Sequence, residues 1–157
     1  MSRWPVRLAA LTCCLTLAGP LLAAPEVAAG PRKDARAVRR MLNAERRARD
    51  VRTLRRGTKA SRVALRNSRR MARQRDVFHP RNMPGAIKNL RWSTWGDNVV
   101  CARSLEQAHR KVMSSRRSRR NVLNRRFRFV GIGVARSTPR PRACRSATYW
   151  ITQIFYG

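Results

Sequence analysis

Apolar residues in the first half of the chain recur with helical spacing. From Ala35 to about Asp50 they fall three or four positions apart, which is the period of one helix face. The positions that carry the pattern are Ala35, Val38, Met41, Leu42 and Ala44. Arginine occupies most of the other positions, so the pattern predicts a helix with one buried face, preceded by a short polar lead-in at residues 30–34.

Two further helices are predicted by the same kind of pattern. A stripe of mostly small residues along residues 58–74 predicts a helix packed closely against another element. This stripe consists of Ala60, Val63, Ala64, Met71 and Ala72. Farther along the chain, Ser104 followed by Gln107 is typical of a helix start. The buried face of that third helix would consist of Leu105, Ala108 and Val112.

Residues 78–98 show no sustained period and contain two prolines and two glycines. This composition predicts a long loop, and long loops in compact domains usually carry function or support it. Trp92 and Trp95 lie in this loop, where their rings could stack on a ligand or fill the core. We favour the core, because a tryptophan side chain buries a large area.

Alternating apolar residues indicate two strands near the end of the sequence, at residues 127–135 and 148–156. Gly131 and Gly133 lie in the first of them, but without a third glycine or a following helix they do not indicate a phosphate-binding loop. A loop rich in proline and arginine joins the two strands at residues 137–144. Helices followed by short antiparallel strands predict a single α+β domain.

The composition agrees with one folded domain and adds an unusual charge. The chain has 157 residues, of which 43% are hydrophobic, and a formal net charge of +30. Only four of the positive residues are lysine, and arginine binds phosphate or carboxylate with two parallel hydrogen bonds. The charge therefore favours a polyanionic partner. The alternative is a coding bias toward arginine at tolerant surface positions, and the spread of arginines along the whole chain favours it.

Residues 1–29 have the pattern of a secretory signal peptide. Two arginines precede an apolar run that the Gly19-Pro20 pair interrupts, and small residues follow. Cleavage after Ala29 fits the small-residue rule best, with Ala24 as the alternative, and we expect no transmembrane segment after cleavage. The mature chain would then keep Cys101 and Cys144. One pair in an oxidising compartment most simply forms a disulfide.

Six stretches of the sequence, taken in order, resemble one family. They are LNAERR, RNSRRMA, GDNVVC, SLEQAHRKVMSSRRSRRNVLN, FRFVGIGVA and YWITQIFYG. Together they resemble the bacterial secreted branch of the CAP superfamily, which includes cysteine-rich secretory proteins, venom antigens and plant pathogenesis-related proteins. The resemblance implies a three-layer α/β/α sandwich with a short antiparallel sheet over residues 35–157. It also implies a disulfide between Cys101 and Cys144.

The resemblance also implies where the family's cleft lies. His79 matches the first cleft histidine, and Asp97, followed by Asn98, stands where the family has the glutamate of a Gly-Glu-Asn motif. The second histidine would fall at Ser118, directly before Arg119, and is absent. One histidine and one short carboxylate supply at most two metal ligands, whereas zinc sites use three or four protein ligands or three and a water. We therefore expect neither a bound metal nor another cofactor.

The same segment holds an arginine cluster, formed by Arg116, Arg117, Arg119 and Arg120. The first two of these replace the family's Pro-Gly turn, so the cluster belongs to the cleft side of the fold and is a candidate anion-binding site. Ser118 could act as a nucleophile only with a base in hydrogen-bond reach, and a turn or capping role is the simpler interpretation. His109, among polar neighbours, is expected at the surface.

These observations support three hypotheses about function. The first is a secreted, monomeric, non-enzymatic CAP protein that binds an anionic polymer or lipid of the cell envelope or of a host surface. The second is a residual metal-dependent hydrolase at His79 and Asp97. The third is a non-specific nucleic-acid binder, which the charge alone would allow at low salt. No specific nucleic-acid-binding motif is present.

Overall fold

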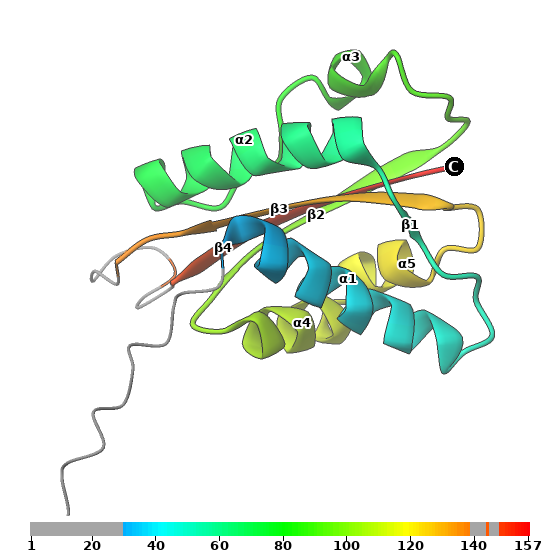
Figure 1. Ribbon diagram of the computed structural model, residues 1–157, viewed down its shortest axis with the longest axis horizontal. Helices are drawn as coiled ribbons and strands as arrows, with labels where there is room; N and C mark the ends of the chain where they lie inside the picture. Colours follow the sequence, from blue (N-terminus) through cyan, green and yellow to red (C-terminus); the bar gives the residue numbers. More distant parts are fainter. Residues whose placement is uncertain (1–29, 139–143, 145–147) are drawn as a thin grey trace, which may run out of the picture.

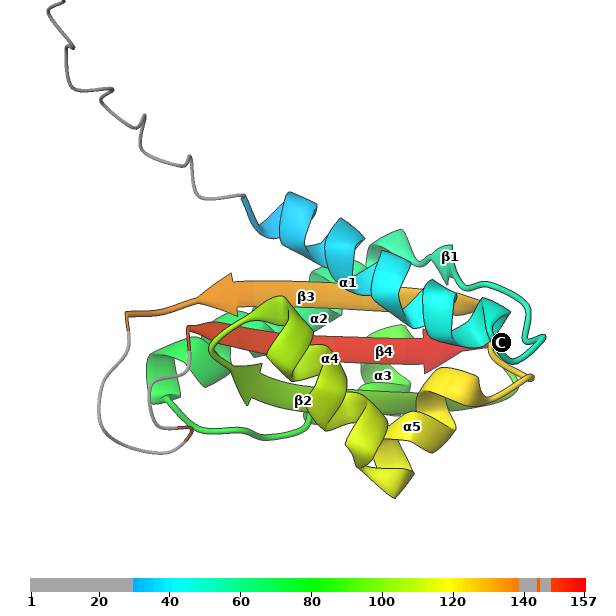
Figure 2. The same ribbon diagram turned by 90° about the horizontal axis from the view of Figure 1, so that it is seen from below.

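The computed structural model describes residues 30–138, 144 and 148–157. Within them, a four-stranded sheet has α2 and α3 on one face and α1, α4 and α5 on the other (Figures 1 and 2). This arrangement confirms the expected three-layer α+β sandwich. The elements are α1 Pro31–Arg47, β1 Arg55–Arg56, α2 Thr58–Gln74, α3 Met83–Ile87, β2 Trp95–Ala102, α4 Leu105–Ser114, α5 Arg116–Leu123, β3 Phe129–Arg136 and β4 Tyr149–Tyr156.

The order of strands in the sheet is β1-β3-β4-β2. β4 lies in the middle and pairs antiparallel with both β2 and β3, whereas the short β1 runs parallel to β3. The sheet therefore has two different edges, one formed by β2 and the other by β1 and the exposed length of β3. The predicted signal peptide and most of the loop rich in proline and arginine lie outside the described residues.

The first helix begins earlier than its apolar pattern indicates. Helix α1 starts at Pro31, so residues 31–34 form its first turn and are not a lead-in. Proline is favoured at this position, because its missing N–H would be unpaired there in any case. Asp34 also holds the turn in place: both of its carboxylate oxygens accept hydrogen bonds of 3.0 Å from Arg136. This pairing raises the pKa of Arg136.

The close packing predicted for residues 58–74 is confirmed. Helix α2 has the expected bounds, and Ala60 and Ala64 are fully buried against β3. Gly131 and Gly133 of β3 face them, and a Cβ at either glycine would overlap the backbone of the helix. The two glycines thus allow the helix to approach the sheet, which explains their place in a strand.

The predicted loop at residues 78–98 is partly wrong. It contains the short helix α3, and its last residues belong to β2, which begins at Trp95. Gly96, Asp97 and Asn98 have low strand preference, but pairing with β4 along the whole of β2 overrides it. The core role of the tryptophans is supported, since both Trp92 and Trp95 pack against a buried cluster.

One arginine of α1 is completely buried. Arg46 has no exposed surface, and its guanidinium donates hydrogen bonds of 2.6–3.1 Å to four backbone carbonyls. These carbonyls belong to Arg52, Val122, Asn124 and Phe127. Burial lowers the pKa of Arg46. The side chain fastens the end of α1 to the end of α5 and to the segment leading into β3.

No helix in the described part of the chain is both long and apolar enough to span a bilayer.

Candidate functional site

The structure brings His79 and Asp97 together. His79 lies in the loop after α2 and Asp97 on the edge strand β2, and His79 Nδ1 is 2.5 Å from Asp97 Oδ2. The carboxylate is largely buried, with 10% of its side chain exposed, whereas 53% of the imidazole is exposed. Since the carboxylate engages Nδ1, the imidazole presents Nε2 for proton exchange or ligand contact.

Asn98, the next residue of β2, is the centre of a buried polar network on the α5 face of the sheet. Its Nδ2 donates to the backbone carbonyl of Ser118 and to Gln153 Oε1, both at 3.1 Å. Its Oδ1 accepts a hydrogen bond of 2.9 Å from Asn121, which also donates to the backbone carbonyl of Asp97. Asn98 therefore positions α5 against β2 and does not itself face a ligand.

Ser118 lies in the first turn of α5, not in a turn between elements. Its backbone N–H donates to Ser115 Oγ, so Ser115 caps the helix. In the described residues the Ser118 hydroxyl forms no hydrogen bond with His79, and the couple needed to activate a serine nucleophile is not formed. Of the turn or capping role expected for Ser118, the structure supports a place in the capping hydrogen bond, at the start of a helix whose one fully buried side chain is Val122.

The arginine cluster forms the outer face of α5. Arg116, Arg117, Arg119 and Arg120 are all exposed and, at 3.6 residues per turn, lie within an arc of about 160°. Arg119 donates a hydrogen bond of 3.1 Å to the carbonyl of Met113. Among the described residues, no carboxylate forms an ion pair with any of the four. The arginine cluster is therefore a solvent-facing cationic surface on α5.

His109 is not the surface residue that its polar neighbours suggest. Only 14% of its side chain is exposed, and Nε2 lies 3.1 Å from Glu45 Oε1 of α1. The hydrogen bond from His109 lowers the pKa of Glu45, against the opposing effect of burial. This pair joins α1 to α4. Residues 64 positions apart form it, so local sequence pattern could not reveal it.

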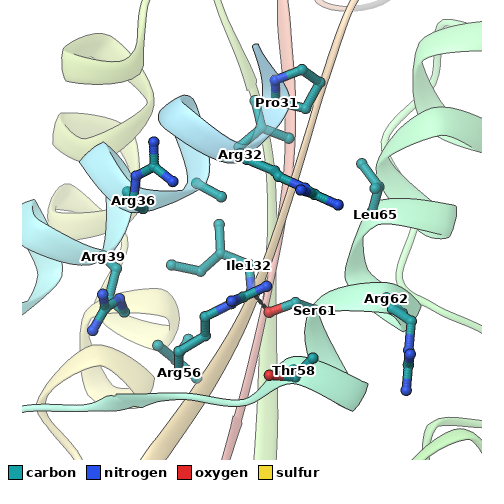
Figure 3. A pocket seen from close by; sticks show the side chains of 13 residues that line it. Pro31, Arg32, Arg36, Arg39, Arg56, Thr58, Ser61, Arg62, Leu65 and Ile132 are labelled. Carbon is teal, nitrogen blue, oxygen red and sulfur yellow. Dashed lines mark hydrogen bonds between the residues drawn. The ribbon is translucent and has the colours of Figure 1, made fainter. Parts of the chain in front are cut away.

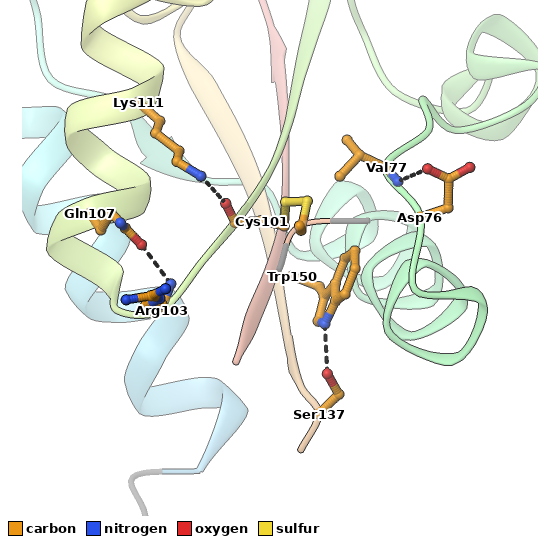
Figure 4. The surroundings of a disulfide bond; sticks show 9 residues. Asp76, Val77, Cys101, Arg103, Gln107, Lys111, Ser137 and Trp150 are labelled. Carbon is orange, nitrogen blue, oxygen red and sulfur yellow. Dashed lines mark hydrogen bonds between the residues drawn. A yellow bond between two sulfur atoms is a disulfide. The ribbon is translucent and has the colours of Figure 1, made fainter. Parts of the chain in front are cut away.

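The predicted disulfide between Cys101 and Cys144 is confirmed, with their Cα atoms 6.0 Å apart (Figure 4). Lys111 Nζ donates a hydrogen bond of 3.0 Å to the carbonyl of Cys101. Nearby, Trp150 Nε1 donates to Ser137 Oγ at 2.8 Å. The disulfide thus attaches Cys144, which precedes β4, to the end of β2, and the buried Trp150 lies close to it.

The potential metal ligands at His79 and Asp97 do not match a protein metal site. Within residues 30–138, 144 and 148–157, no three histidine, cysteine, aspartate or glutamate side chains come together as a metal would require. The His79–Asp97 pair offers only two potential metal ligands, and these two side chains are already hydrogen-bonded to each other. These residues therefore do not supply the three or four ligands of a zinc site.

The three-layer sandwich is the fold of solved SCP-domain structures. The chain belongs to the CAP family: the model described as "Cysteine-rich secretory protein family" matches residues 39–155. This confirms the resemblance found in the sequence. A sequence search among curated proteins found no match.

Several solved structures share this fold. An extracellular SCP-domain protein from Bacillus anthracis is 18% identical, with a TM-score of 0.65 over 80% of this chain and 41% of its own. A cysteine-rich secretory protein from Staphylococcus aureus is 16% identical, with a TM-score of 0.64, over 80% and 39%. An outer surface protein from Borrelia burgdorferi is 10% identical, with a TM-score of 0.66, over 80% and 93%. The chain thus spans about two fifths of the first two proteins.

Proposed function

We propose that this CAP domain acts outside the cell as a non-enzymatic protein that binds an anionic envelope polymer through the arginine cluster of α5. The observation that carries the proposal is the exposure of four neighbouring guanidinium groups that no described carboxylate neutralises. Such groups bind phosphate or carboxylate oxygens in pairs. The network around Asn98 holds their helix in place, so binding does not have to order it.

Three observations support a location outside the cell. Residues 1–29 have the pattern of a signal peptide. The disulfide suits an oxidising compartment. Two of the similar structures are described as an extracellular and an outer surface protein, which is a property of those proteins and agrees with export of this one.

Direct binding by the arginine cluster can be distinguished experimentally from the long-range attraction that the net charge of the whole molecule exerts. The net charge of +30 attracts any polyanion at low salt. At physiological ionic strength this attraction is screened over about 8 Å, whereas contacts made directly by guanidinium groups persist. A comparison between variants of equal charge therefore distinguishes a site from a general field.

The test uses the mature, oxidised protein. One variant replaces Arg116, Arg117, Arg119 and Arg120 with glutamine, and a matched control replaces four exposed helix arginines elsewhere: Arg40, Arg66, Arg69 and Arg73. Both lose four charges. Binding to a polyglycerol-phosphate polymer, anionic vesicles, DNA and polyphosphate is measured across a salt series. At about 0.15 M salt, we expect the first variant to lose about tenfold in polymer affinity and the control less than about threefold.

Two outcomes would contradict the proposal. Equal losses in both variants would mean that the arginines act only through net charge. Binding to DNA that persists at physiological salt and depends on α5, with no polymer binding, would favour the nucleic-acid alternative.

The His79–Asp97 pair gives the hydrolase alternative one specific observation in its favour. A carboxylate that engages Nδ1 orients an imidazole as a general base through Nε2. The main proposal predicts that hydrolysis of an ester panel, with and without added zinc, is the same for the protein and for His79→Ala. It also predicts zinc binding in Ser118→His but not in the unmodified protein. Turnover that disappears in His79→Ala would establish the hydrolase instead.

A further inference from the structure

A pocket of 420 Å³ opens at the opposite edge of the sheet from His79 and Asp97. The N-terminal part of α1, the strand β1 and the first two turns of α2 surround it, and β3 forms its base (Figure 3). Since β1 and β3 form one edge of the sheet and β2 the other, the pocket is separate from the His79–Asp97 pair and from the arginine cluster of α5.

The base and walls of the pocket are aliphatic. Val130, Ile132 and Val134 line it from β3, Leu65 from α2 and Ala35 from α1. The three β3 side chains lie where β1 covers β3 only opposite its first two residues, and they form a narrow apolar base because only 1–6% of their surface is exposed. An apolar part of a ligand placed here would leave water without requiring any buried polar group to lose its partner.

The rim of the pocket is cationic. Its arginines are Arg32, Arg36, Arg39, Arg56 and Arg62. Figure 3 shows Arg32 and Arg56 extending into the space between α1 and α2, whereas Arg62 points away from it. No carboxylate among the described residues lines the pocket. The first turn of α1 does contain Asp34, but Arg136 of β3 engages both of its oxygens.

Of the two hydroxyl-bearing residues that line the pocket, Thr58 and Ser61, the second already has hydrogen-bond partners. Ser61 Oγ donates to the carbonyl of Gly57 at 2.8 Å and accepts from the N–H of Ile132 at 3.3 Å. A polar part of a ligand would therefore be recognised by the guanidinium groups, with the Thr58 hydroxyl as a further polar group. Two guanidiniums above an aliphatic base match a ligand with one anionic end and one hydrocarbon end.

We propose that this pocket binds a small aliphatic anion, with a carboxylate or a phosphate monoester held by Arg32 and Arg56 and a hydrocarbon chain against β3. The size follows from the volume: 420 Å³ holds about 14 non-hydrogen atoms at about 30 Å³ for each water-sized group. Decanoate and octyl phosphate, with about 12 and 13 such atoms, fit within this volume.

Calorimetric titration of the mature, oxidised protein tests the proposal with decanoate, octyl phosphate and inorganic phosphate as probes. The double variant Arg32→Gln/Arg56→Gln removes the two inward guanidiniums, and Arg66→Gln/Arg69→Gln is the control with the same charge on the exposed face of α2. All four arginines are exposed, so the fold should survive. We expect about tenfold weaker binding of one or both amphiphiles in the first variant, and less than about threefold in the control.

The headgroup and the chain are distinguished by the probes. Preference for decanoate or for octyl phosphate identifies the anionic group, and inorganic phosphate should bind at least about tenfold more weakly than octyl phosphate, because it lacks the apolar contact. Equal binding of inorganic phosphate and octyl phosphate would overturn the proposal, as would equal losses in the two double variants or no binding of either amphiphile. Substitution of the α5 arginines should leave the result unchanged, so this test and the polymer test fail independently.

Discussion

The two edges of the sheet are both rich in arginine, yet they are built differently. At the β2 edge, buried polar groups bond to one another around Asn98 and hold α5, whose arginines face outward. At the edge formed by β1 and β3, an aliphatic surface lies beneath arginines that reach over it. The first arrangement offers a rigid charged surface, whereas the second offers a hollow with an apolar base.

This difference shows why the charge of the molecule does not by itself locate a site. Arginine has at least three roles here: it is buried and structural at Arg46, outward-facing on α5, and at the rim of the pocket. The surroundings of each guanidinium decide which role it has. A long, polar ligand matches the surface of α5, and a short ligand with an apolar end matches the pocket.

The largest effect is expected at Arg46, which joins α1 to the end of α5 and is therefore connected to both regions. Arg46→Leu would leave four carbonyls without their donor, and we expect it to lower the free energy of unfolding by about 4 kcal/mol. The exposed neighbour Arg47 provides the control, since Arg47→Leu should change stability by less than about 0.5 kcal/mol. Denaturant unfolding measures both, and similar small losses would show that Arg46 is not structural.

A smaller effect, confined to the β2 edge, is expected at Asn98. Asn98→Ala removes three hydrogen bonds and leaves buried partners unpaired, so we expect a loss of about 2 kcal/mol. Because the network positions α5, polymer binding should weaken, whereas octyl phosphate binding at the other edge should not change. Asn89→Ala, at an exposed position, should alter none of the three measurements. Weaker octyl phosphate binding in Asn98→Ala would mean that the two edges are coupled.

The sequence pattern predicted the parts of the fold in which the local preferences of the residues match the structure that they adopt. The bounds of α2 follow from its stripe of small residues, and Ser104 does cap α4, accepting a hydrogen bond of 3.1 Å from Gln107 N–H. The strand β2 and the helix α5 were missed for one reason: each depends on contacts with residues that are distant in the sequence. The residues of β2 that favour loops are held by β4, and α5 has too few apolar residues to show a helical period.

The sites could be predicted only in part. The family resemblance placed His79 beside Asp97, and the structure brings the two together. The pocket was not predicted, because four separate elements contribute its residues and no local motif marks it. The pairing of His109 with Glu45 was missed for the same reason, since it depends on how α1 and α4 pack.

The smallest effect concerns pH. The His109 hydrogen bond lowers the pKa of Glu45 in the folded protein below its ordinary value of 4.5. The unfolded chain therefore binds more protons at Glu45 near that pH, and the stability that this pair contributes is present above pH 4.5 and is lost as the pH falls below it. The contribution should be below about 1 kcal/mol, because the pair is partly exposed.

Unfolding at neutral and acidic pH measures this contribution as the difference between the protein and Glu45→Gln. The variant should lose less stability on acidification. Identical pH dependence in the two proteins would show that the pair contributes nothing to folding. Neither protein should differ in binding at neutral pH, since the pair lies between α1 and α4 and away from both arginine-lined regions.

The most direct test of the account is one experiment with two variants and two ligands at physiological salt. The α5 variant, in which Arg116, Arg117, Arg119 and Arg120 are glutamine, and the pocket variant Arg32→Gln/Arg56→Gln are each titrated with the polyglycerol-phosphate polymer and with octyl phosphate. We predict that the α5 variant has weaker affinity for the polymer and unchanged affinity for octyl phosphate. The pocket variant should have weaker affinity for octyl phosphate and unchanged affinity for the polymer. Weakening of both ligands in both variants, in proportion to the charge removed, would contradict the existence of two separate sites.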